Sequence, residues 1–117
     1  MDHIVSMVER RPLVIFSRSG CPMSHAVKAL MRDFGANATV YELDQLSDGL
    51  QVEAALLQMM GARSGGRLSA GSVPAVYIGQ QFVGGADAVM SLHLQNKLVP
   101  MLLAAGAIFL WHQQTPF

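Results

Sequence analysis

Residues 14–24 read Val14-Ile15-Phe16-Ser17-Arg18-Ser19-Gly20-Cys21-Pro22-Met23-Ser24, an apolar run that gives way to polar residues and then to a proline. The β-branched and aromatic residues at its start are typical of a buried strand. Pro22 suits the first position of a helix, where the N–H that proline lacks would have no partner. The stretch therefore predicts a strand that leads into a helix, with Cys21 at the junction.

Cys21 is the only cysteine among the 117 residues, so the chain cannot form an intramolecular disulfide. If Pro22 begins the helix, the N–H groups of Met23 and Ser24 point toward the Cys21 sulfur, and the helix dipole adds about half a positive charge there. Arg18 adds a cation on the same rim. We expect Cys21 to be a nucleophile with a lowered pKa rather than a buried, inert thiol.

The composition excludes several classes of protein. Hydrophobic residues make up 51% of the chain and charged residues 14%, and the formal net charge is zero. These values argue against disorder and against direct binding of nucleic acid. The chain has no linker between two cores, no signal peptide and no run of roughly 18 apolar residues that could span a membrane. We expect a single domain over residues 1–117, without membrane contact, in the cytoplasm and nucleus.

The periodicity of apolar residues changes in a regular order along the chain. In the first half it predicts a helix over 2–10, a strand over 13–16, a helix over 22–34, a strand over 39–43 and a helix that follows the N-cap Asp48 and ends at Gly61. A mobile loop is expected over 61–72, followed by a hairpin of strands 74–78 and 81–83. Two helices complete the chain, one over 88–95 capped by Asp87 and a last one that is capped by Asn96 and stops at Gly106. A right-handed crossover makes the first two strands parallel. The expected class is α/β, a small mixed four-stranded sheet with helices on both faces.

Ser24 stands where a dithiol enzyme with a Cys-x-x-Cys motif has its second cysteine. A serine cannot resolve a mixed disulfide, although its hydroxyl can donate a hydrogen bond to the thiolate. The alternative is a polar residue of the first turn without a role in catalysis. His25 is expected to be a partly exposed helix residue rather than a general base.

Two further segments carry features of a binding site. In Ser72-Val73-Pro74, a cis bond would turn the Val73 N–H and C=O outward to receive an extended peptide, although the residues alone favour a trans proline. In Gly84-Gly85-Ala86-Asp87, the glycines allow close approach of a backbone, and the following helix offers N–H donors to a carboxylate. A plain turn followed by an N-capping aspartate is the alternative.

These motifs, Phe16-Ser17-Arg18, Cys21-Pro22-Met23-Ser24, Ser72-Val73-Pro74 and Gly84-Gly85-Ala86-Asp87, resemble those of the glutaredoxins in order and spacing. The resemblance covers nearly the whole chain and implies a thioredoxin-like fold, a cis Pro74 and glutathione as the cofactor. It implies that the backbone of glutathione pairs with Val73, that its γ-glutamyl carboxylate lies over Ala86 and Asp87, and that its glycyl carboxylate meets Arg18. The implied cofactor-binding residues are Arg18, Pro22, Met23, Val73, Pro74, Gly85, Ala86 and Asp87.

The C-terminal half resembles that of the land-plant CC-type glutaredoxins. The resemblance lies in Val89-Met90-Ser91-Leu92-His93-Leu94, Leu98-Val99-Pro100-Met101-Leu102 and Ala105-Gly106-Ala107-Ile108-Phe109-Leu110-Trp111. In that subfamily an Ala-Leu-Trp-Leu-like ending contacts TGA-type bZIP transcription factors, and a Leu-x-x-Leu-Leu-like helix is associated with co-repressors. The implied docking residues are Ala107, Ile108, Phe109 and Leu110 of a tail over 107–117, with Leu98, Leu102 and Leu103.

Two departures from the subfamily pattern matter. The site reads Cys21-Pro22 in place of paired cysteines, which makes the chain a monothiol variant, and the ending reads Ala107-Ile108-Phe109-Leu110. The alternative for the last segment is a helix that packs on the core and is followed by a tail. That alternative explains the leucines well, whereas the large apolar residues after Gly106 need a further surface to bury them.

Three functions remain open. The first is a monothiol oxidoreductase in which Cys21, aided by Ser24, reduces glutathione mixed disulfides rather than protein dithiol disulfides and regulates TGA-type factors. The second is a non-catalytic transcriptional adaptor. The third is a dimer that holds a [2Fe–2S] cluster with Cys21 of each chain and two glutathiones, whereas the other two functions imply a monomer. Pro22 argues against the third, because cluster-binding members usually place a glycine there.

Overall fold

The computed structural model describes residues 2–63 and 73–108. Its elements follow one another along the chain as α1 (Asp2–Val8), β1 (Leu13–Ser17), α2 (Pro22–Asp33), β2 (Thr39–Glu42), the 3-10 turn η1 (Leu43–Gln45), α3 (Gly49–Arg63), β3 (Ala75–Ile78), β4 (Gln81–Gly84), α4 (Ala86–Leu94) and α5 (Leu98–Ala105). Within these two ranges, no helix has both the length and the apolar character needed to cross a membrane.

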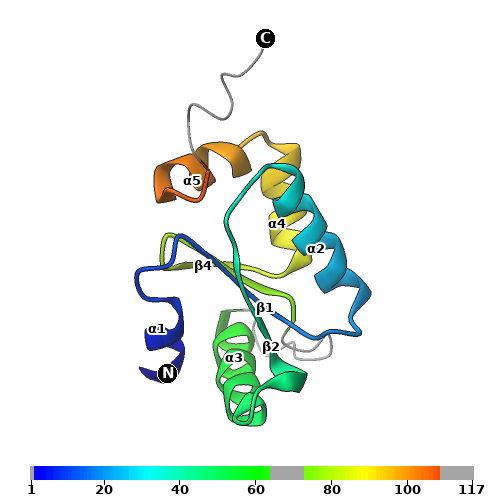
Figure 1. Cartoon of the computed structure of the whole chain (residues 1–117), viewed down its shortest axis with the longest axis vertical. Helices are drawn as coiled ribbons and strands as arrows, with labels where there is room; N and C mark the ends of the chain where they lie inside the picture. The colour runs from blue at the N-terminus through cyan, green and yellow to red at the C-terminus, as the bar shows by residue number, and fades with distance from the viewer. Residues whose placement is uncertain (1, 64–72, 109–117) are drawn as a thin grey trace.

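The four strands form one mixed sheet in the order β2-β1-β3-β4. β1 runs parallel to β2 and antiparallel to β3, and β3 and β4 form the predicted hairpin. Both residues of its turn have positive φ, 59° at Gly79 and 68° at Gln80, as a tight two-residue turn requires. Helices α2, α4 and α5 lie on one side of the sheet and α1 and α3 on the other (Figure 1). The α/β class and the thioredoxin-like fold are confirmed.

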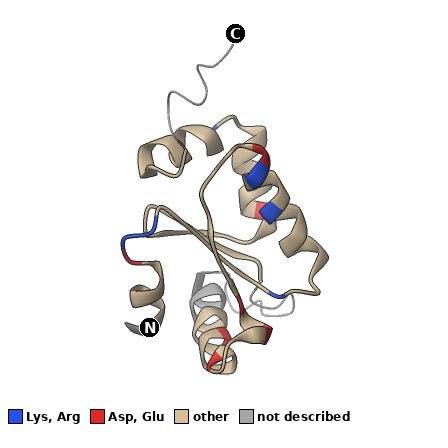
Figure 2. Ribbon diagram, in the orientation of Figure 1, with Lys and Arg blue, Asp and Glu red and all other residues tan. Residues whose placement is uncertain are grey.

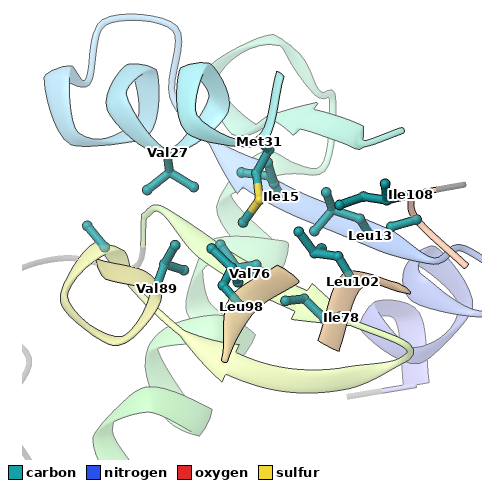
Figure 3. Packing of buried hydrophobic residues seen from close by; sticks show 12 residues of the cluster. Leu13, Ile15, Val27, Met31, Val76, Ile78, Val89, Leu98, Leu102 and Ile108 are labelled. Carbon is teal, nitrogen blue, oxygen red and sulfur yellow. The ribbon is translucent and has the colours of Figure 1, made fainter. Parts of the chain in front are cut away.

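The central strand β1 contributes to a hydrophobic core on each face of the sheet. Leu13 and Ile15 belong to the core that packs against α2, α4 and α5 (Figure 3). Val14 and Phe16 belong to the second core, against α1 and α3. All five residues of β1 are buried, which explains why its sequence is a continuous apolar run rather than an alternating one.

Three predicted helix boundaries were wrong. Gly61 lies inside α3, because a single glycine costs a helix only about 1 kcal/mol. Gly85, not Asp87, is the N-cap of α4, and Asp87 belongs to the first turn. Asn96 has a φ of 61° and Lys97 is the N-cap of α5, since a left-handed residue ends a helix rather than beginning one. Most of the loop predicted over 61–72 falls on residues 64–72, outside the described residues.

The prediction that the C-terminal residues dock a partner needs the largest correction. Gly106, with a φ of 83°, ends α5 as predicted and turns the chain back onto the sheet. The N–H of Ala107 then donates to the Leu102 carbonyl (2.9 Å), and the Ala107 carbonyl accepts from the N–H of Asn37 (2.9 Å). Ala107 and Ile108 are only 1% and 2% exposed, and Ile108 points into the core in Figure 3.

The expected role of four side chains in docking is therefore wrong, because Leu98, Leu102, Ala107 and Ile108 are all buried in the core against α2 and the sheet. Leu103 is partly buried against the same core. Phe109 and Leu110 lie outside the described residues. The alternative of a helix that packs on the core is the one that the structure supports for 98–108.

Candidate active site

The sheet topology brings the three predicted site segments to one edge. Phe16 near the end of β1 pairs with Ala75 at the start of β3, and Val76 pairs with Gly84 at the end of β4. The residues that follow β1, precede β3 and follow β4 therefore leave the sheet at the same edge. These are the segments 18–24, 73–74 and 85–87.

Cys21 is the N-cap of α2, with an extended backbone (φ −91°, ψ 117°), and Pro22 follows as the first helical residue. The Cys21 N–H donates to the Arg18 carbonyl (3.1 Å), and the Cys21 carbonyl accepts from the N–H of His25 (3.1 Å). The side chain of Cys21 is partly exposed. The predicted junction of strand and helix is confirmed, and the thiol is open to a substrate.

The pKa of the Cys21 thiol is lowered. The largest cause is the Ser24 side chain, which favours the thiolate. The backbone N–H groups of Ser24 and Met23 and the charge of Arg18 lower the pKa further, whereas partial burial of the sulfur raises it. The Ser24 hydroxyl is fully buried and has no hydrogen bond of ordinary geometry among the described residues. A buried hydroxyl without another partner can donate to the Cys21 sulfur, and a thiolate accepts such a bond more strongly than a neutral thiol does.

Ser24→Ala should raise the pKa of Cys21. The substitution removes the hydroxyl that favours the thiolate most but leaves the backbone donors and the helix dipole in place. The rate of Cys21 alkylation by iodoacetamide, measured against pH, should then have its inflection at a higher pH than in the wild-type protein. An unchanged inflection would mean that the backbone donors alone set the pKa.

The loop before Cys21 is held by two side chains. The Ser19 N–H donates to Asp44 Oδ1 of η1 (3.1 Å), and the Ser19 hydroxyl donates to the other carboxylate oxygen. These bonds lower the pKa of Asp44. His25 Nε2 donates to the Ser19 carbonyl (2.7 Å), so this exposed side chain also helps to hold the loop. Asp44 could not be predicted as part of the site, because its contact with Ser19 spans 25 residues.

Arg18 makes an ion pair with Glu53 of α3. The Arg18 side chain is 37% exposed and that of Glu53 19%, so the pair is partly buried. Figure 2 shows further acidic residues in the segment that precedes α3, whereas Glu53 is the single acidic residue of α3 itself. The charge of Arg18 is one of the causes that lower the pKa of the Cys21 thiol. Glu53 was not predicted from the sequence, because its contact with Arg18 joins residues far apart in the chain.

The other two segments have the backbone conformations that a glutathione site needs. The Val73–Pro74 bond is cis, so the trans form favoured by the residues alone was wrong and the form implied by the resemblance is confirmed. Ala86 and Asp87 are the first residues of α4, whose N-terminus has no side-chain cap. Its N–H groups can therefore bind a carboxylate. Gly84 must be glycine, because a Cβ there would lie 2.7 Å from the Cβ of Ala88.

Within the two described ranges, no three His, Cys, Asp or Glu residues lie together in a way that could hold a metal ion. The edge of the sheet therefore combines a partly exposed thiol of lowered pKa, a paired arginine, a cis peptide bond and a free helix N-terminus. This arrangement suits nucleophilic attack by Cys21 on a sulfur of a ligand that carries carboxylates.

The chain is similar in sequence to known glutaredoxins. The family model described as Glutaredoxin matches residues 13–83. The chain is 52% identical over 109 residues to monothiol glutaredoxin-S6 of Arabidopsis thaliana, an alignment that covers 93% of this chain and 99% of the relative. It is 46% identical over 110 residues to monothiol glutaredoxin-S1 of the same plant, with 94% and 100% covered.

Two solved structures are similar to the whole fold. The buckwheat glutaredoxin–glutathione complex has a TM-score of 0.80 and 43% sequence identity, with 92% of this chain and 90% of that chain covered. The holo form of glutaredoxin C1 from Populus tremula x tremuloides has a TM-score of 0.78 and 38% identity, with 89% and 95% covered.

Proposed function

The chain belongs to the glutaredoxin family, and we propose that it is a monothiol, glutathione-dependent oxidoreductase that removes glutathione from mixed disulfides. The observation that carries this proposal is the environment of Cys21, a partly exposed thiol of lowered pKa with a serine where a resolving cysteine would stand. The similar buckwheat protein was solved with glutathione, which supports glutathione as the ligand.

The reaction uses one protein sulfur and two molecules of glutathione. The Cys21 thiolate attacks the glutathione sulfur of a protein–glutathione mixed disulfide, the S–S bond breaks, and the protein thiolate leaves and takes a proton from solvent. The thiolate of a free glutathione then attacks the same sulfur in the Cys21–glutathione disulfide. Glutathione disulfide is released and the Cys21 thiolate is restored. Each turnover therefore consumes one free glutathione as reductant, and the other half of the released disulfide is the glutathionyl group of the substrate.

The helix N-terminus acts in both steps. Cys21 is the nucleophile in the first step and the leaving group in the second, and a thiolate stabilised by N–H donors is a better leaving group. Arg18 and the first residues of α4 would orient glutathione by its two carboxylates, and Val73 would pair with its backbone. These roles follow the resemblance to the family.

Ser24→Cys tests the one-thiol character of the site. The wild-type protein should release glutathione from a glutathionylated peptide but leave the dithiol disulfides of insulin intact, because Ser24 cannot resolve a mixed disulfide. The variant should gain insulin reduction of roughly tenfold or more over the wild type, since its second sulfur attacks intramolecularly. Equal reduction of insulin by the two proteins would contradict the proposal.

We further propose that the protein is a CC-type member that regulates TGA-type bZIP transcription factors, with or without turnover at Cys21, and acts in the cytoplasm and nucleus. The support is the resemblance of its C-terminal half to that subfamily. With Leu98, Leu102, Ala107 and Ile108 in the core, Leu103, Phe109 and Leu110 remain as the docking residues of this proposal.

The [2Fe–2S] dimer is the less favoured candidate. It would need Cys21 and a glutathione from each of two chains, and Pro22 fixes the backbone next to the sulfur at the start of α2. A visible absorption spectrum of protein purified without oxygen separates it from the other functions, because a cluster absorbs strongly and a free thiol does not.

A further inference from the structure

The ion pair between Glu53 and Arg18 lies at the position where the family resemblance places the glycyl carboxylate of glutathione. Glu53 already presents a carboxylate to the Arg18 guanidinium in the protein without ligand. We propose that Glu53 is a specificity-determining residue that competes with the glycyl carboxylate for Arg18 and so weakens the binding of glutathione. This inference rests on the proposed function, because it concerns the ligand of the same site.

Both partners of the pair are held in place before a ligand arrives. On α3, Glu53 follows Val52, which is 1% exposed and packs in the core against α1 and β1. Arg18 follows the fully buried Ser17 and precedes Ser19, which is bonded to Asp44 and His25. The backbone is therefore anchored at both positions, which places the two side chains within reach of each other before a ligand binds.

An incoming carboxylate therefore meets an arginine whose charge is already balanced. The nearby Glu53 carboxylate also repels it, and a side chain that is only 19% exposed is screened less by solvent than a fully exposed one. The γ-glutamyl carboxylate does not encounter this competition, because its expected partners are the N–H groups of α4. The effect should be confined to ligands with a glycyl carboxylate.

The test is the binding of two ligands that cannot react with Cys21. S-methyl glutathione carries the glycyl carboxylate, and S-methyl glutathione amide, in which the glycyl carboxyl group is a primary amide, lacks that charge. Measured by titration calorimetry, Glu53→Gln should bind S-methyl glutathione about three- to tenfold more tightly than the wild type, the range for one charged group freed from competition. It should bind S-methyl glutathione amide with unchanged affinity.

Glu42→Gln is the matched control. The Glu42 side chain is 20% exposed and makes an ion pair with Lys28 (2.7 Å), so the variant loses the same charge at similar burial without touching Arg18. Its affinity for both ligands should equal that of the wild type. As a second readout without ligand, Glu53→Gln should lower the pKa of Cys21, because the guanidinium charge is no longer balanced.

Three outcomes would overturn the inference. Unchanged affinity of Glu53→Gln for S-methyl glutathione would show that Glu53 does not compete, while the proposed function would stand. Weaker binding of S-methyl glutathione by the variant would show that Glu53 supports the ligand instead of opposing it. Failure of both proteins to bind either ligand would contradict the proposed function and the inference together.

Discussion

Cys21→Ser should abolish the release of glutathione from mixed disulfides, with a loss of roughly 10²-fold or more, down to the uncatalysed rate. The chain has no other thiol that could take over, because Cys21 is its only cysteine. A serine hydroxyl at the N-cap stays protonated at neutral pH, so the helix N-terminus has no anion to stabilise. The measurement is the release of glutathione from a glutathionylated peptide in the presence of free glutathione.

The same variant separates the enzyme from the adaptor. Serine is a favourable N-cap residue, so the thermal unfolding temperature should not fall, and this serves as the control for folding. If the protein acts by docking, the variant should still bind a TGA-type bZIP factor in a pull-down. Loss of that binding would mean that the thiol itself makes the contact. Wild-type activity in the variant would contradict the assignment of Cys21 as the nucleophile.

A chain that ends after Gly106 should be less stable than the full chain by about 3–5 kcal/mol. It loses the core contacts of the Ala107 and Ile108 side chains. It also loses the Ala107 carbonyl, which accepts the hydrogen bond from the N–H of Asn37. The free energy of unfolding in urea, compared with that of the full chain, gives this loss directly.

A chain that ends after Phe109 is the matched control. It keeps both Ala107 and Ile108, whose side chains are buried, and Ile108 lies among the labelled core residues of Figure 3. Its free energy of unfolding should lie within about 1 kcal/mol of the full chain. Equal stability of the two truncated chains would contradict the assignment of Ile108 to the core. The chain ending after Phe109 is also the suitable truncation for a TGA-type pull-down, because its fold is kept.

Most of the fold could be predicted because its signals are local. The apolar run 13–16, the helical period from Pro22 and the Gly79-Gln80 turn each lie within one short stretch of sequence. The position of Cys21 at the start of α2 followed in the same way from Pro22. Helix boundaries were less predictable, since Gly85 and Lys97 took the cap positions expected of Asp87 and Asn96.

The unpredicted parts of the site are contacts between residues far apart in the sequence. Asp44 reaches Ser19 and Glu53 reaches Arg18 only because η1 and α3 lie beside the end of β1. Ile108 shows a different limit. A large apolar side chain after a helix-ending glycine needs burial, but its sequence does not say whether the chain's own core or a partner provides it. Here the core does.

The most direct test of the central claim is the mass of the protein after stoichiometric incubation with a glutathionylated peptide, without free glutathione and at a pH below the ordinary thiol pKa of about 8.5. The account predicts that one glutathionyl group moves to Cys21 while the peptide appears as a free thiol. A mixed disulfide between Cys21 and the peptide, or an unmodified protein, would contradict it.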